Sequence, residues 1–511
     1  KRTVIDKINK GAFIVNYTGH GGEDGLSGER IISTQDLRSL KNGIKMPLFF
    51  TATCDFSRFD MVDATSAGEA LLLNENGGAI ALFTTTRIVY SSPNFNLNNN
   101  FYNIVFSKKE AEHTCIGDVF RNTKVLNNGG LNDRNFTLLG DPALRLALPS
   151  TKLKTKINSI VNLTQNEATD TLKSLMKVRV TGELIDPSGV KLSDFSGYIF
   201  TKLFDKKIPY TTLLNDGGNM PFSYTFRHNL LFEGKNSVKN GAFSIDFVVP
   251  KDIAYQIDFG KMSFYAVSSN RLECNGYQSV LIGGSEMNAY NDNEGPELKL
   301  YMNHSSFIFG NATDNSPLIL VMLKDSSGIN ITSENIAHSM EAILDEKSTQ
   351  SIKLSPYFEP KLDSYQEGKI KYRLSDVSVG RHSVEVKAYD TYNNSNRAYT
   401  EFIVAGDAKI ALAHVLNYPN PFTSNISFYF EHNQPGKNLD ITIQIFTISG
   451  KLIKSFNEDL YSENIRVGPI SWDGLDDYGD AIGKGVYIYQ IQVKGEDGST
   501  AQHFEKLVIL K

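Results

Sequence analysis

Two stretches near the start of the chain decide its fold: Ala12-Phe-Ile-Val-Asn-Tyr-Thr-Gly-His20-Gly-Gly22 and Met46-Pro-Leu-Phe-Phe-Thr-Ala-Thr-Cys54-Asp55. Each is an apolar, β-branched and aromatic run of the kind that forms a buried strand. Because only a short crossover separates them, we predict that they are parallel neighbours in one sheet. The carboxyl ends of parallel strands meet at one edge, where open α/β folds build their sites. This pairing would place His20 and Cys54 at the same edge.

The remainder of residues 1–148 alternates between helix and strand patterns. Ser33 is expected to cap a helix that stops at Gly43, and Ser66-Ala-Gly-Glu69 has the spacing of a capping box. Thr114 is expected to cap the last helix. The predicted helices cover 33–43, 67–76, 96–107 and 115–127, and a buried strand covers 79–86. This alternation is typical of a parallel sheet. Since only about three strands are recognised, we expect earlier strands of the sheet to lie on the amino-terminal side of this chain.

Length and composition limit the classes of function. A chain of 511 residues with 41% hydrophobic residues can build roughly three or four domains of about 150 residues each. The formal net charge of -5 is spread along the sequence without a basic stripe, which argues against nucleic-acid binding. No run of about 18 uninterrupted apolar residues occurs, so no transmembrane helix is predicted.

From about residue 150 onward the pattern changes to short alternating apolar and polar stretches, which are typical of antiparallel β-sandwiches. The polar segment 288–296 is expected to separate two such sandwiches. A second linker is expected at 406–409, after which Asn417-Tyr-Pro-Asn-Pro-Phe422 opens a last all-β unit.

A thiol and an imidazole at one sheet edge are the minimal parts of a cysteine nucleophile with its base. Glycine after His20 allows a tight turn and leaves an N–H group free. Acyl transfer needs two N–H donors for the developing oxyanion, and the amides of Gly21 and Cys54 could supply them. The competing interpretation is that Cys54 is a small buried residue at a strand end. Spacing alone leaves both open.

Three separated motifs resemble the gingipain-type cysteine peptidases, which have a caspase-like fold. They are Asn16-Tyr-Thr-Gly-His-Gly-Gly22, the strand that ends at Cys54, and Leu139-Gly-Asp-Pro-Ala-Leu144. The fuller strings Gly19–Leu26 and Thr51–Asp60 are similar to one branch of this family, the sortases of the type IX secretion system.

The final unit carries an independent resemblance. Tyr418-Pro-Asn-Pro-Phe422, Phe446-Thr-Ile-Ser-Gly-Lys451, Ser471-Trp-Asp-Gly474 and Gly485-Val-Tyr-Ile-Tyr489 resemble a type IX carboxy-terminal domain. Together, the resemblances imply the carboxy-terminal half of a caspase/gingipain-like α/β domain, followed by all-β sandwiches and a terminal Ig-like β-sandwich. The expected domains are 1–148 (peptidase, partial), 149–290 and 291–408 (β-sandwiches) and 409–511 (type IX carboxy-terminal domain).

The family resemblance implies roles for individual residues. Cys54 would be the nucleophile and His20 the general base, and the backbone amides of Gly21 and Cys54 would form the oxyanion hole. An acidic residue that orients the histidine in family members has no counterpart in this chain. Glu23 and Asp24 are candidates to shape the substrate pocket, and the simpler interpretation is that they are solvated turn carboxylates.

The remaining candidates are assigned structural roles. Cys115, near a helix start, has no neighbouring base in the pattern, and Cys274 lies in a sandwich and is expected to be inert. No metal site and no cofactor are predicted.

The leading hypothesis is a bacterial cell-surface cysteine transpeptidase, associated with the outer membrane, that removes carboxy-terminal sorting domains from secreted cargo through a thioester at Cys54. The resemblance implies three partners: that cargo, the outer-membrane β-barrel protein PorV, and a lipopolysaccharide acceptor. One alternative is a secreted gingipain-like endopeptidase whose terminal domain is its own export signal. Another is a non-catalytic surface adhesin with a decayed peptidase domain.

Overall fold

The structure is a computed structural model of the 511-residue chain. It describes residues 1–107, 114–130, 132–148, 153–213, 220–332, 338–347, 350–375, 377–404, 410–462, 465–496 and 498–510. The chain divides into two compact units, Lys1–Lys152 and Leu153–Lys511. Within the described ranges, every helix is too short or too polar to cross a membrane.

The first unit is built on a four-stranded sheet with the order β1-β5-β6-β7. Its strands are β1 (Ile14–Thr18), β5 (Leu48–Ala52), β6 (Ala81–Thr85) and β7 (Phe136–Leu139). The pairs β1–β5 and β5–β6 are parallel, as the sequence predicted, and β7 is antiparallel to β6. All five residues of both β5 and β6 are buried, because helices cover both faces of the sheet.

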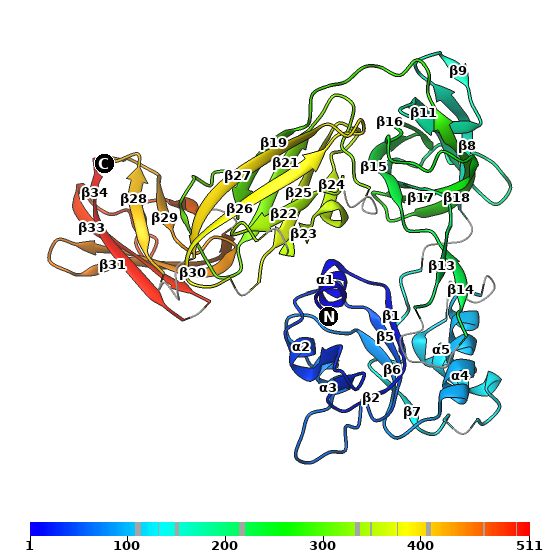
Figure 1. The fold of residues 1–511 in the computed structure, drawn as a ribbon. Helices are drawn as coiled ribbons and strands as arrows, with labels where there is room; N and C mark the ends of the chain where they lie inside the picture. The colour runs from blue at the N-terminus through cyan, green and yellow to red at the C-terminus, as the bar shows by residue number, and fades with distance from the viewer. Residues whose placement is uncertain are drawn as a thin grey trace. The chain divides into compact units, whose positions relative to one another are not determined.

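The helices form a layer on each side of the sheet (Figure 1). One layer contains α4 (Ser91–Val105) and α5 (Ile116–Leu126), which pack on Phe50 and Phe83. The other contains α1 (Arg2–Lys10), α2 (Thr34–Arg38) and α3 (Ala67–Leu72), which pack on Phe49 and Leu82. Neighbouring residues of one strand therefore face different cores, as the two-residue period of a strand requires.

The predicted cap at Ser33 and the predicted capping box at Ser66 are both present, and Ser33 also proves to be part of a full capping box. The Ser33 side chain accepts a hydrogen bond from the Asp36 amide, and the Asp36 carboxylate accepts one from the Ser33 amide. The Ser66–Glu69 pair makes the same reciprocal bonds at the start of α3. Each box satisfies N–H groups that would otherwise have no partner at the helix start.

Several predicted helix boundaries were wrong. Helix α4 begins at Ser91, before the predicted start at 96, and the Asn132 side chain bonds both backbone groups of its N-cap residue, Tyr90. Helix α2 ends at Arg38 instead of Gly43, because Asn74 Nδ2 donates to the carbonyl oxygens of Leu37, Arg38 and Leu40 and so satisfies the helix end early. Helix α3 stops at Leu72, before Asn76.

At the start of α5 the N-cap residue is Cys115 instead of Thr114, and no side chain caps the helix. The extended backbone of Cys115 forms a β-bridge with Arg145, which sets the helix start one residue later.

The second unit begins with a continuous nine-stranded sheet of order β10-β18-β17-β12-β15-β16-β11-β8-β9. An additional pairing joins β18 to β8, so the sheet curls around one core instead of forming the two separate sheets expected for 149–290. The strands are β8 (Lys154–Asn162), β9 (Glu167–Ala168), β10 (Thr171–Ser174), β11 (Lys177–Ile185), β12 (Gly197–Phe204), β15 (Leu230–Lys239), β16 (Ala242–Val248), β17 (Asp258–Ser268) and β18 (Glu273–Ser285). A separate hairpin pairs β13 (Ile208–Thr211) with β14 (Ser223–Phe226).

The next domain packs two sheets around a second core. One has the order β19-β21-β25-β24 and the other the order β20-β27-β26-β22-β23. The elements are β19 (Glu297–Met302), β20 (Ala312–Thr313), β21 (Leu318–Lys324), β22 (Glu341–Leu344), β23 (Ile352–Lys353), η2 (Ser355–Tyr357), β24 (Phe358–Pro360), β25 (Glu367–Arg373), β26 (Gly380–Tyr389) and β27 (Ser395–Val404).

The last domain is also a sandwich, with sheets β28-β29-β32 and β31-β30-β33-β34. Its strands are β28 (Leu412–Tyr418), β29 (Ile426–His432), β30 (Lys437–Thr447), β31 (Leu452–Ser462), β32 (Arg466–Trp472), β33 (Gly485–Gly495) and β34 (Thr500–Ile509). Phe422, Trp472 and Tyr489, which belong to the motifs noted in the sequence, are buried in its core.

The predicted boundaries at 148/149 and 408/409 adjoin or lie within segments outside the described residues, as does the predicted linker 406–409.

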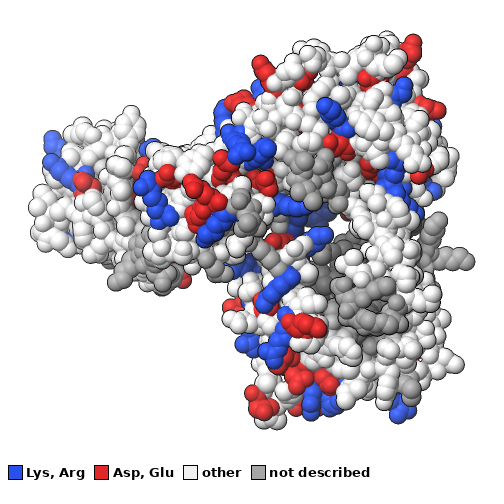
Figure 2. Space-filling view, in the orientation of Figure 1, with Lys and Arg blue, Asp and Glu red and all other residues white. Residues whose placement is uncertain are grey.

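The first unit also contains a small sheet that follows His20. Its strands are β2 (Gly21–Gly22), β3 (Gly25–Leu26) and β4 (Ile32–Ser33). Basic and acidic side chains are interspersed on the face drawn in Figure 2, in keeping with the absence of a basic stripe in the sequence.

The sheet of the first unit has a hydrophobic core on each face, and a substitution in one of these cores tests how much it stabilises the unit. Phe50 is fully buried and its ring contacts Phe83, Phe101 and Phe136. Phe50→Ala should lower the stability of this unit by about 3–5 kcal/mol, because it removes an aromatic ring from a closed core. Amide hydrogen exchange of 48–52 and 81–85 in the full chain measures the change. Phe95→Ala, at an exposed position on α4, should leave exchange within about 0.5 kcal/mol of wild type. Equal effects of the two substitutions would contradict this description of the core.

Candidate functional site

The strands that end at His20 and Cys54 are parallel neighbours. Their register pairs Thr18 with Ala52, and the Gly19 amide donates to the Ala52 carbonyl oxygen at 3.3 Å. His20 and Cys54 each lie two residues beyond this last pair. The pairing therefore brings both residues to the carboxyl edge of the sheet, as we predicted from the sequence.

The backbone of His20 is fixed while its side chain is exposed. Its carbonyl oxygen accepts hydrogen bonds from Tyr17 Oη at 2.6 Å and from the Ser27 amide at 2.8 Å. Burial raises the pKa of the Tyr17 hydroxyl, which keeps it protonated as a donor. Among the described residues, no carboxylate forms a hydrogen bond or ion pair with the imidazole ring, and the third member of a triad is not found there.

Cys54 lies on a sharp turn directly after β5. The next residue, Asp55, has a φ of 51°, in the left-handed region that few non-glycine residues adopt. The half-buried Cys54 Sγ lies 3.6 Å from the Val89 carbonyl oxygen, within hydrogen-bond reach of a thiol. The described contacts contain no hydrogen bond between Cys54 and His20. Such bonds often tighten only when substrate binds, so this geometry is compatible with a nucleophile and its base.

A chain of buried hydroxyl groups lies behind this turn. Thr51 Oγ1 donates to Thr84 Oγ1 at 2.8 Å, and Ser57 Oγ lies 2.7 Å from the same Thr84 oxygen. All three residues are fully buried. This network ties β5 and β6 to the segment after Cys54, and a satisfied buried network of this kind holds its members in one arrangement.

The Cys54 amide is a free donor, since it makes no hydrogen bond within the described parts of the chain. The Gly21 amide is also directed away from its own hairpin. His20 and Ser27 form a hydrogen-bonded pair, so the next pair along the ladder, Gly21 and Leu26, is a non-hydrogen-bonded pair whose N–H groups point outward. Both donors that the sequence suggested for an oxyanion hole are thus available.

Gly21 also packs closely on the strand that carries the cysteine. A Cβ atom at this position would lie 2.6 Å from Thr53 Oγ1 and 2.8 Å from the Gly25 carbonyl oxygen. No side chain fits there without displacing the backbone. Thr53 Oγ1 itself is buried and has no hydrogen-bond partner among the described residues.

Glu23 and Asp24 lie at the turn between β2 and β3. The Asp24 carboxylate pairs with Arg30 at 3.2 Å, and both side chains are largely exposed. The Glu23 carbonyl oxygen accepts from the Ala67 amide at 2.8 Å, which ties this turn to the start of α3. No described hydrogen bond joins either carboxylate to His20 or Cys54, so their role in a substrate pocket stays a prediction.

Three residues of this site were not found from the sequence. Asn98, on α4, exchanges hydrogen bonds with Asn16 at 2.9 and 3.2 Å and donates to Thr18 Oγ1, so it anchors the end of β1. Arg87 and Asp60 form a two-point ion pair between the segments that follow β6 and β5. Hydrogen bonds from Arg87 lower the pKa of Asp60, so the pair persists into acid. Only the fold brings these partners together, and no local spacing marks them.

The other cysteines have structural surroundings. Cys115 Sγ lies 3.2 Å from Asp118 Oδ2 at the start of α5. Cys274 is fully buried in β18, and burial raises its pKa to about 11, so it remains a thiol at neutral pH.

The comparisons with known proteins agree with the motifs at these two strand ends. Residues 1–147 match Peptidase family C25. This match supports a cysteine-peptidase-related function for the segment and confirms the resemblance to gingipain-type peptidases. None of the curated proteins compared matches the chain.

Among solved structures, dimeric latent PorU from Porphyromonas gingivalis is 26% identical, with 84% of this chain and 41% of that chain covered and a TM-score of 0.33. The complex of the pro- and mature domains of RgpB from the same organism is 18% identical, covers 55% of this chain and 56% of that chain, and has a TM-score of 0.27. This chain thus spans less than half the length of the PorU chain.

The close approach of Gly21 to Thr53 predicts a matched pair of variants. Gly21→Ala should slow the acylation of Cys54 by a peptide p-nitrophenyl ester about 10- to 100-fold, because the added Cβ displaces the Gly21 amide. Gly22→Ala is the control, since a Cβ there meets no atom within 4 Å. Stopped-flow release of p-nitrophenol measures both rates. If the two variants react alike, the Gly21 amide has no part in the site.

Proposed function

We propose that this protein is a cell-surface cysteine transpeptidase, a sortase that removes carboxy-terminal sorting domains from cargo of the type IX secretion system. The observation that carries the proposal is the parallel pairing of β1 with β5, which puts an imidazole and a thiol at one sheet edge beside two free amides. That arrangement suits acyl transfer through a thioester.

In the proposed reaction, His20 takes the proton of the Cys54 thiol, and the thiolate attacks the carbonyl carbon of the scissile peptide bond. The negative charge moves to the carbonyl oxygen, which accepts hydrogen bonds from the amides of Gly21 and Cys54. When the intermediate collapses, the C–N bond breaks and His20 gives its proton to the leaving amine of the sorting domain. The cargo is left as a thioester on Cys54.

The second half of the reaction repeats these steps with a new nucleophile. An acceptor amine attacks the thioester carbonyl, His20 accepts a proton from that amine, and the thiol leaves to regenerate Cys54. We propose an amine on surface lipopolysaccharide as the acceptor. Water competes with it and would yield the hydrolysed cargo.

The fate of the terminal domain distinguishes the sortase from a secreted endopeptidase. Three of the four motifs that resemble a type IX carboxy-terminal domain contribute Phe422, Trp472 and Tyr489 to one closed core, with Phe422 and Trp472 in ring contact. We propose that this domain binds PorV and keeps the protein at the outer membrane. A sortase should retain residues 409–511 in its mature form, whereas a secreted endopeptidase should lose them, and the intact mass of the surface protein distinguishes the two.

The decisive experiment replaces Cys54 in the full-length protein within its own cells. Cys54→Ala should leave cargo with its sorting domain attached and without lipopolysaccharide, because no thioester can form. Cys115→Ala is the matched control and should process cargo at the wild-type rate. Immunoblots and mass spectrometry of secreted cargo give the result.

Normal processing in Cys54→Ala cells would refute the sortase. Labelling of the purified protein by a thiol-reactive peptide probe separates the remaining alternative. If the site is active, the probe labels the wild type and Cys115→Ala but does not label Cys54→Ala. If the protein is an adhesin with a decayed peptidase domain, the probe labels none of the three proteins at Cys54.

A further inference from the structure

Three aspartates from distant parts of the chain meet in the second unit. Asp292 lies in the segment before β19, Asp325 directly follows β21, and Asp390 directly follows β26. One carboxylate oxygen of each lies within 4.8 Å of the others. Asp390 is fully buried and Asp325 is 8% exposed, so this is not a cluster of solvated surface charges.

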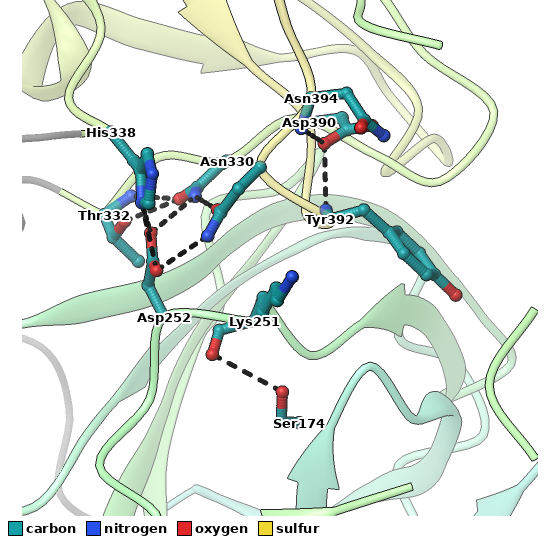
Figure 3. Close-up of polar contacts among 10 residues, drawn as sticks. Ser174, Lys251, Asp252, Asn330, Thr332, His338, Asp390, Tyr392 and Asn394 are labelled. Carbon is teal, nitrogen blue, oxygen red and sulfur yellow. Dashed lines mark hydrogen bonds and ion pairs between the residues drawn. The ribbon is translucent and has the colours of Figure 1, made fainter. Parts of the chain in front are cut away.

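The donors to these carboxylates are all neutral. Asp325 Oδ1 accepts from the amides of Ser327 at 2.7 Å and Gly328 at 3.1 Å. Asp390 accepts from the amides of Tyr392 and Asn394 and from Asn394 Nδ2, at 2.8–2.9 Å (Figure 3). Asp292 accepts from the Glu294 amide and from the Ser327 hydroxyl. None of these groups compensates a negative charge.

The described residues give this cluster no compensating positive charge. Within the described ranges, no lysine, arginine or histidine forms an ion pair with any of the three aspartates. Asp325 Oδ2 accepts no described hydrogen bond, although its residue is more than nine-tenths buried. Burying several carboxylates together without a positively charged partner is strongly unfavourable.

We propose that Asp292, Asp325 and Asp390 bind a calcium ion. The ligands are hard oxygen atoms, which calcium and magnesium prefer over the softer transition metals. They come from three loops of irregular geometry, which calcium accepts because it takes 6–8 oxygens at about 2.3–2.6 Å in flexible arrangements, whereas magnesium requires a near-ideal octahedron. Water or backbone oxygens would complete the coordination.

The bound ion would strengthen a junction between two domains of the second unit. The loops that carry Asp325 and Asp390 also contact Asp252, from the preceding domain: Asn330 Nδ2 donates to it at 3.3 Å and Asn393 Nδ2 at 2.8 Å. His338 Nδ1 lies 2.9 Å from the same carboxylate (Figure 3), and the Lys251 amide donates to the Thr391 carbonyl oxygen. Asp252 thus has its own partners, and the calcium ion would fix the loops that supply them.

Isothermal titration of the chelator-treated full chain with calcium chloride tests the site directly. Wild type should bind one ion with a dissociation constant of about 10⁻⁴–10⁻³ M, the range of extracellular calcium modules. Asp325→Asn and Asp390→Asn should lose this binding or weaken it at least about tenfold. Glu359→Gln, which removes an exposed carboxylate from β24 of the same domain, should bind as wild type does.

Thermal unfolding adds a readout that does not depend on titration heats. Calcium at about 5 mM should raise the melting temperature of wild type and Glu359→Gln by at least about 3 °C, and magnesium should have a smaller effect. Without calcium, Asp325→Asn should melt at or above the wild-type temperature because it removes a repelled, unpaired carboxylate.

The calcium titration of wild type decides the proposal even if a variant does not fold. Absence of binding up to about 10 mM calcium, or an unchanged affinity in both aspartate variants, would overturn it. Neither result bears on Cys54, so this site and the proposed peptidase activity can fail independently.

Discussion

The parallel pairing of β1 with β5 is the constraint on which the candidate site depends. A parallel pair needs a crossover between its strands, and here that crossover contains the β2–β3–β4 turn structure and α2. Because both strands run in the same direction, both chains leave the sheet at the same edge. The turn after His20 and the turn after Cys54 are therefore neighbours, and the close approach of Gly21 to Thr53 follows from that pairing.

The cores on both faces of the sheet keep the pairing in register. Phe49 and Phe50 are adjacent in sequence and enter different cores, so a shift of one residue would exchange both side chains. Hydroxyl and ionic contacts then define the surroundings of the cysteine. Thr84 joins Thr51 and Ser57, and Arg87 holds Asp60. The site thus combines a rigid sheet with turns fixed by buried polar groups, the arrangement that positions catalytic groups well.

Sequence patterns predicted those features that depend on neighbouring residues. The buried strands, the Ser33 cap, the Ser66–Glu69 capping box and the His20–Cys54 edge all follow from local periodicity or from short spacings. Features set by distant partners were missed. Asn74, in the loop after α3, ends α2, and the pairing of β18 with β8 curls a sheet that was expected to form a two-sheet sandwich. The three aspartates were missed for the same reason, since each lies in an ordinary polar loop until the fold brings them together.

The proposed function depends on Cys54 acting as a nucleophile with His20 as its general base. Tryptic mass spectrometry after brief exposure to a peptide p-nitrophenyl ester tests it most directly, by locating the acyl group and timing its formation in wild type and in His20→Ala. We expect a thioester on Cys54 that forms at least about 100-fold more slowly without His20. An acyl group on Cys115, or equal rates in the two proteins, would contradict it.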